Sequence, residues 1–208
     1  MTFETNKTMG GIGALLMVIS PIASYGAGMF SGLLGLVGLI LVLIAMKGLA
    51  DHYNEAGIFN NTLYGVVLTI VGAIVFAGTV IIAMAGFLSD LNIDWATFST
   101  DPSAISNMDW GQFANFDVIM SHIATVLIGL LVLFVFVSSL FYKKSLDSLA
   151  KKTNVGLFGT TGLILLIGAV LTIIAVGFIL IWVAGILLTI AFFSIKSETT
   201  PPPAPTTM

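Results

Sequence analysis

The sequence of 208 residues contains no cysteine. Disulfide bonds, thiolate metal sites and cysteine nucleophiles are therefore excluded. Arginine is also absent, so that all seven basic side chains are lysines. The planar guanidinium that binds phosphate through two parallel hydrogen bonds is missing, and nucleic acid is not expected as a partner.

Charge of either sign is scarce. Only 8% of the residues are charged and 58% are hydrophobic, whereas a soluble domain carries about 25% charged residues. The mean hydropathy is +1.11. So few charges cannot cover a surface that faces water, which indicates that most of this surface faces lipid.

Long apolar runs take the place of the missing charge. A helix needs about 20 apolar residues to cross the hydrocarbon core of a bilayer. The last uncharged run, from Val155 to Ile195, is long enough for two helices joined by a tight turn near 175–177. The sequence therefore predicts six crossings, which cover about 9–23, 29–46, 63–88, 118–142 and the two halves of 155–195.

We predict an all-α integral membrane protein with one six-helix domain over residues 1–195. Tight hairpins are expected between the first two helices and between the last two. The outer loop, 89–117, interleaves aspartates with aromatic residues and is expected to form short helices on the outer leaflet. The proline-rich tail, 196–208, is expected to be disordered and cytoplasmic.

The two signs of charge are segregated along the chain. With six crossings every lysine falls on one side, and the positive-inside rule then places both termini in the cytoplasm. The lysines are Lys7, Lys47, Lys143, Lys144, Lys151, Lys152 and Lys196. The opposite side carries Asp90, Asp94, Asp101, Asp109 and Asp117 and no lysine.

The stretch KGLADHYNEAGIFNN, residues 47–61, is a polar connector between two apolar runs. Lys47, Asp51 and Glu55 stand four residues apart, on one face of a helix that continues the second crossing. Gly57 is expected to end that helix, and Asn60 or Asn61 to cap the next. With His52, the three charged residues form a candidate docking surface.

No metal or cofactor is expected. The two histidines, His52 and His122, fall on opposite sides of the predicted topology. The spacing of the outer aspartates matches no EF-hand loop. The sequence also contains no HExxH, GxSxG or P-loop motif.

The second connector, FYKKSLDSLAKKTN, covers residues 141–154 and carries four lysines: Lys143, Lys144, Lys151 and Lys152. Lysines beside a membrane attract anionic lipid headgroups, each by about 1 kcal/mol. The alternative is that these lysines only orient the chain.

Small residues form a stripe along the third crossing: Gly65, Thr69, Gly72, Thr79, Ala83 and Gly86. Helices in lipid associate through such faces because small side chains let backbones approach closely. The stripe packs either within the monomer or as a dimer seam.

The middle of each predicted crossing lacks charged residues. Pumps and ion-coupled carriers usually place ionisable groups there. The polar groups inside the crossings are hydroxyls, which bond to their own helix without needing a ligand.

The two ends of the chain resemble each other. Thr5-Asn6 and Thr153-Asn154 each precede a glycine-rich helix, a tight turn and a second helix that ends near a lysine. A parallel repeat is one interpretation; the other is that glycine-rich hairpins in lipid look alike.

Four segments taken in order carry a family resemblance: TNKTMGGIGALL, KGLADHYNEAGIFNNTLYG, FYKKSLDSLAKKTNVGLFGTTGLILLIGAVLTII and IAFFSIK. Together they resemble an archaeal family of membrane proteins catalogued as domain of unknown function 996. The resemblance covers nearly the whole chain except the outer loop and the tail. It transfers no functional residue.

The expected function is that of a small non-enzymatic membrane protein, a structural, assembly or accessory subunit. Its expected partners are the lipid bilayer and another membrane protein or a second copy of itself. The alternative is a carrier or pore for a neutral or lipid-like solute.

Overall fold

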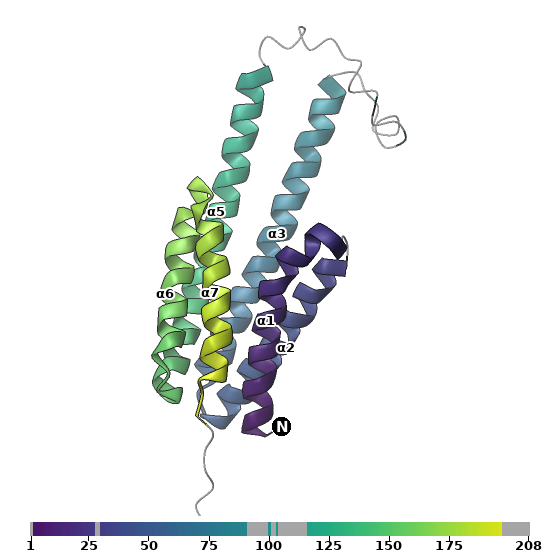
Figure 1. Ribbon diagram of the computed structural model, residues 1–208. Coiled ribbons are helices and arrows are strands. Elements are labelled where there is room, and N and C mark those ends of the chain that lie inside the picture. The colour runs from purple at the N-terminus through teal and green to yellow at the C-terminus, as the bar shows by residue number, and fades with distance from the viewer. Residues whose placement is uncertain (1, 28–29, 91–99, 101–102, 104–115, 197–208) are drawn as a thin grey trace, which may run out of the picture. The chain divides into compact units, whose positions relative to one another are not determined.

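The computed structural model describes residues 2–27, 30–90, 100, 103 and 116–196, and the side chains of 2–23, 32–85, 100, 103 and 125–196. Figure 1 follows the helices in chain order. They are α1 (Phe3–Ala27), α2 (Phe30–His52), α3 (Ala56–Asp90), α5 (Phe116–Thr153), α6 (Gly156–Leu171), the short 3-10 helix η3 (Thr172–Ile174) and α7 (Val176–Phe193). The described residues contain no strand.

Within the part of the chain that the structure describes, the prediction of an all-helical fold is confirmed, and five helices are long and apolar enough to cross a membrane. Helices satisfy every backbone hydrogen bond internally, as a chain surrounded by lipid requires. The five candidate spans are Gly32–His52, Ala56–Ala85, Thr125–Thr153, Gly156–Ile174 and Val176–Phe193. Helix α1 has 25 residues and contains Pro21, and its crossing of the membrane stays a prediction. The outer loop and the tail lie almost entirely outside the described residues.

Contacts divide the chain into two units. Unit 1 comprises Met1–Gly65 and Ser139–Met208, and unit 2 comprises Val66–Ser138. All seven lysines belong to unit 1.

The hairpin of α1 and α2 is held by direct backbone contact. A Cβ atom added at Gly13 would lie 2.7 Å from the Gly38 carbonyl oxygen, and one added at Gly38 would lie 2.6 Å from the Gly13 oxygen. Lipid supplies little hydrophobic drive for helices to associate, so close van der Waals contact at such points stabilises the pair. The sequence analysis did not single out this pair of glycines.

The hairpin of α6 and α7 is built in the same way but turns more tightly. Gly168 and Gly177 face each other so closely that neither leaves room for a Cβ atom without displacing its neighbours. The chain reverses at Ala175, whose φ of 62° lies in the left-handed region. The Thr172 hydroxyl donates to the Gly168 carbonyl at 2.9 Å, so its hydrogen-bond donor is satisfied within the turn.

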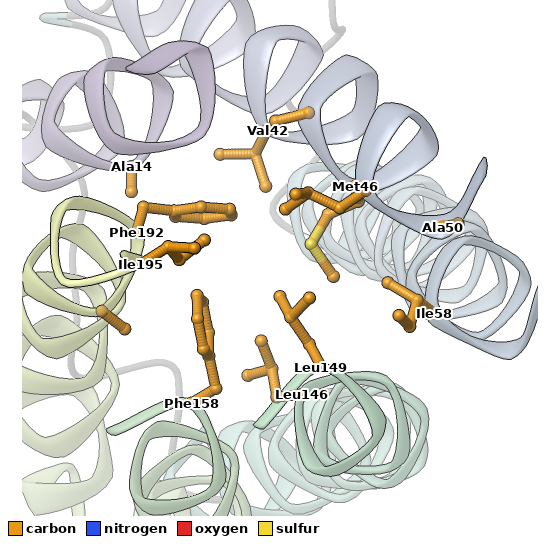
Figure 2. Close-up of a cluster of buried hydrophobic side chains, with 13 residues drawn as sticks. Ala14, Val42, Met46, Ala50, Ile58, Leu146, Leu149, Phe158, Phe192 and Ile195 are labelled. Carbon is orange, nitrogen blue, oxygen red and sulfur yellow. The ribbon is translucent and has the colours of Figure 1, made fainter. Parts of the chain in front are cut away.

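One hydrophobic cluster fills unit 1 (Figure 2). Phe158 of α6 and Phe192 of α7 meet edge to face with their ring centroids 5.3 Å apart. Leu149 of α5 and Ile58 of α3 are fully buried beside them. The aromatic pair and the aliphatic side chains thus bring helices that are distant in sequence into one packed core.

The predicted small-residue stripe lies on α3, and two of its members receive aromatic rings from α5. Within unit 1, Gly65 faces the ring of Tyr142, and within unit 2, Gly72 faces that of Phe134. The Thr79 hydroxyl bonds to its own helix, at the Val75 carbonyl. Thr69 is exposed and Ala83 is half-buried, whereas Gly86 lies outside the residues whose surroundings the structure describes. At the two glycines, then, the stripe receives rings from within the same chain.

Glycine-to-alanine substitutions test the backbone contact between α1 and α2. Gly13→Ala is expected to lower the thermal unfolding midpoint in detergent, because the new methyl group overpacks the interface by about 1–3 kcal/mol. Gly32→Ala is the control, since its added Cβ meets no described atom within 4 Å apart from its chain neighbours and the backbone of its own helix. This control is expected to raise the midpoint slightly, because alanine favours the helix. Equal midpoints for the two variants would contradict the contact.

Candidate functional site

Two short turns at one end of unit 1 form the polar part of the candidate site. The first joins α2 to α3 through Asn54, and the second joins α5 to α6 through Asn154. Both asparagines adopt left-handed backbone conformations, with φ of 49° and 56°. Asparagine tolerates this region better than other residues with a Cβ atom.

The two turns match each other at an offset of 100 residues. Leu49 and Leu149, the last fully buried leucines before each turn, have 0% exposure. Ile58 and Phe158, the first buried residues after each turn, also have 0% exposure. The amide of Ile58 donates to the Glu55 carbonyl at 3.1 Å and that of Phe158 to the Val155 carbonyl at 3.3 Å, so the following helices begin alike.

This repeat differs from the one that the sequence suggested. Asn6 lies inside helix α1, whereas Asn154 forms a left-handed turn, so Thr5-Asn6 and Thr153-Asn154 do not occupy equivalent places. The signal for the repeat was present in the sequence. The pattern Leu-Ala, three intervening residues and then Asn recurs in 49–54 and 149–154.

The expected helix boundaries in the first connector were wrong. Asn54, and not Gly57, ends α2: the Glu55 amide donates to the Ala50 carbonyl at 2.9 Å and the Asn54 amide to the Asp51 carbonyl at 3.3 Å, as in a Schellman motif. Gly57 instead lies in the first turn of α3.

The proposed capping by Asn60 or Asn61 is also wrong. Helix α3 begins before both, at Ala56. The Asn61 side chain donates to the Gly57 carbonyl at 2.7 Å within the helix, and Asn60 is exposed. An asparagine inside a helix can bond back to a carbonyl four residues earlier.

The charged residues of the docking surface are divided between two ion pairs. Lys47 and Asp51 pair along α2, with 2.6 Å between Nζ and Oδ1. Glu55 lies beyond the end of α2 and therefore pairs across the turns with Lys152, at 3.5 Å. His52 stacks near Phe3 of α1, with ring centroids 4.7 Å apart.

The four lysines predicted to contact lipid lie at the end of α5. Lys143 forms an ion pair with Asp147 and is half-buried, whereas Lys144 and Lys151 are exposed. Lys152 reaches the first turn through Glu55. The second turn thus contributes one of its lysines to hold the two turns together.

A buried hydroxyl pair stands beneath the turns. Ser145 of α5 and Thr62 of α3 lie 2.7 Å apart between their oxygens, and Ser145 is also 2.5 Å from the Ile58 carbonyl. Both side chains are buried. Because these polar groups satisfy one another, they fix the register of α3 against α5 within unit 1.

A pocket of about 620 Å³ opens beside the first turn. Its lining comes from the start of α1, the last three turns of α2 and the start of α3. The lining residues are Phe3, Asn6, Leu43, Ile44, Lys47, Gly48, Asp51, His52 and Phe59. The volume lies in the range of small-ligand pockets.

Asn6 is the buried polar residue in this lining, with 3% exposure. Its amide lies where the side chain of residue 48 would stand, so that only glycine fits there. The Oδ1 atom has no hydrogen-bond partner among the described residues. The sequence analysis did not assign Asn6 to a site; a buried asparagine opposite a helical glycine is a three-dimensional signal.

Within the described residues, no three His, Asp or Glu side chains gather closely enough to hold a metal ion. His122 and the outer aspartates lie outside the side chains that the structure describes, so the expectation for them stays a prediction. The predicted separation of the two histidines likewise stays untested.

The fold of the described residues is that of an all-helical protein, in which five helices are long and apolar enough to cross a bilayer. The chain belongs to the family described as protein of unknown function DUF996, which matches residues 34–186. This confirms the resemblance carried by the four sequence segments. A relative is the uncharacterized protein MJ1644 of Methanocaldococcus jannaschii, 30% identical over 200 residues, which cover 95% of this chain and 96% of that protein. No solved structure matches the chain significantly.

Substitutions at the two asparagines test the repeated turn. Asn54→Ala and Asn154→Ala are each expected to destabilise the protein by about 1–2 kcal/mol, because alanine is strained in the left-handed region. Asn54→Gly and Asn154→Gly are expected to retain the wild-type unfolding midpoint within a few degrees. Asn60→Ala, at an exposed position in α3, is the control. Tolerance of alanine at either turn would contradict its left-handed conformation.

Proposed function

We propose that the protein is a multi-pass accessory or assembly subunit of the cytoplasmic membrane, with both termini inside. The paired turns would form its docking surface. The observation that carries the proposal is the ion pair between Glu55 and Lys152, which joins two exposed, oppositely charged turns in unit 1. A pair this exposed adds little stability, about 0.2–1 kcal/mol. We infer that its main effect is to arrange charges for a partner.

The position of the lysines supports the orientation. All seven lie in unit 1, near the starts of α1 and α6 or the ends of α2, α5 and α7. The Phe3–His52 contact and the Lys152–Glu55 pair bring three of these helix ends together. Cytoplasmic loops carry such an excess of lysine.

The hydroxyls inside the helices favour the accessory function over the alternative, a carrier or pore. The side chains of Ser138, Thr161 and Thr189 donate to carbonyls four residues earlier in their own helices, at 2.7, 2.8 and 3.0 Å. A hydroxyl satisfied in this way needs no solute. We keep the carrier as the alternative and propose no catalytic step, since the charged groups of the site are bound in exposed pairs.

Partner capture tests the docking surface. The protein, extracted gently through a tag on its tail, is expected to carry a stoichiometric partner in native mass spectrometry. The double variant Glu55→Lys with Lys152→Glu restores the ion pair but exchanges the charges, so it is expected to fold and to lose the partner at least tenfold. Glu55→Gln alone is the control for losing the pair.

Retention of the partner by the charge-exchanged variant would contradict docking through the turns. A homo-oligomer that holds a small molecule and no other protein would favour the carrier.

The orientation is tested by cysteine labelling, since the wild type offers no thiol. Thr100→Cys is expected to react with a membrane-impermeant maleimide in intact cells. Ser148→Cys, in the second connector, is expected to react only after permeabilisation. Labelling of both from outside would show that no crossing separates them, and the reverse pattern would invert the topology.

A further inference from the structure

We propose that the pocket between α1, α2 and α3 binds the headgroup of a lipid that carries both a phosphodiester and a free hydroxyl. The hydroxyl would hydrogen-bond to the Asn6 amide, and the phosphate would lie near Lys47. This inference rests on the pocket, which shares Lys47, Asp51 and His52 with the predicted docking surface but does not involve the Glu55–Lys152 pair on which the proposed docking rests.

The buried Asn6 amide points to a ligand that forms hydrogen bonds. A buried acceptor without a partner destabilises the folded protein, and Oδ1 has none among the described residues. The terminal torsion of asparagine is broad and nearly two-fold, so a half-turn exchanges the oxygen and the NH₂ group. A hydroxyl both donates and accepts, and therefore satisfies either orientation.

The pocket is amphipathic along α2. Leu43 and Ile44 lie towards the interior of the candidate span Gly32–His52, whereas Lys47 and Asp51 lie in its last two turns. A pocket that is apolar towards the membrane and charged at the end of a span suits a molecule with a tail and a polar head. Its volume of about 620 Å³ accommodates the headgroup with the first part of a chain.

Lys47 retains donors for a phosphate. Its ammonium group lies 2.6 Å from Asp51 and 5.6 Å from the centre of the Phe59 ring. An ammonium has three donors, and 54% of the Lys47 side chain is exposed. Lys47 can thus bind a phosphate while it keeps Asp51, whose second oxygen can accept from a headgroup hydroxyl.

The test compares two lipids that differ by the hydroxyls alone. Phosphatidylglycerol and phosphatidyl-n-propanol with the same acyl chains have the same three-carbon headgroup and carry the same phosphodiester charge, so the exposed lysines of the second turn attract both equally. Native mass spectrometry of the full-length protein measures the fraction that retains each lipid. The wild type is expected to retain phosphatidylglycerol at least tenfold better.

Asn6→Leu keeps the branched shape and the number of heavy atoms of the side chain and removes both hydrogen-bonding groups. It is expected to lower the preference to less than threefold while leaving phosphatidyl-n-propanol binding unchanged. Asn60→Leu, at an exposed position outside the pocket, is expected to keep the tenfold preference. If Asn6→Leu does not fold, Leu43→Trp fills the pocket from its apolar end and is expected to reduce retention of both lipids.

Equal retention of the two lipids by the wild type would overturn the proposal, as would an unchanged preference in Asn6→Leu or full retention in Leu43→Trp. Free glycerol 1-phosphate distinguishes the sources of the headgroup. Displacement of phosphatidylglycerol by free glycerol 1-phosphate, at a concentration similar to that of the lipid, would overturn the lipid assignment in favour of a soluble polyol phosphate. Lack of displacement would support the lipid, since its chain then contributes to binding.

Discussion

The architecture depends on close contact between helices that lipid does not force together. Apolar side chains gain little by leaving lipid for another helix, so stability comes from dispersion contacts at short range. Glycine provides these contacts in two ways. Gly13 and Gly38 allow two backbones to touch, whereas Gly65 and Gly72 make room for the rings of an opposite helix. A methyl group at any of them would separate the partners.

That constraint also shapes the candidate site. The absence of a side chain at Gly48 admits the Asn6 amide to the surface of α2, and this packing leaves the amide oxygen buried, with no hydrogen-bond partner in the described part of the chain. The same packing of α1 on α2 brings Phe3 against His52 and so forms one wall of the pocket. Close helix packing thus creates a polar feature that an apolar interface would not have, and an amphiphile is the kind of molecule that could satisfy it.

The turns add a second level of organisation. A left-handed asparagine reverses the chain within three residues at 53–55, and the equivalent residue does so after α5. Short reversals keep the charged ends of the helices close to the buried cluster of Ile58 and Phe158. For that reason the charges of the two turns are held at fixed spacing, which a docking surface requires. The hydroxyl pair of Ser145 on α5 and Thr62 on α3 limits the sliding of these two helices past each other beside the turns.

The sequence alone determined the helical class, the apolar spans and the segregation of lysine, because these follow from composition and from lengths of apolar runs that lipid demands. It also identified the family. It misplaced the end of α2 at Gly57, since glycine and asparagine both suit a left-handed turn and local propensity does not choose between Asn54 and Gly57.

Only the tertiary structure decided which residues meet. Glu55, which the sequence placed on one helix face with Lys47 and Asp51, pairs with Lys152 instead, and Asn6 lies on Gly48. Contacts between residues about 40 to 100 positions apart depend on packing that no local pattern encodes.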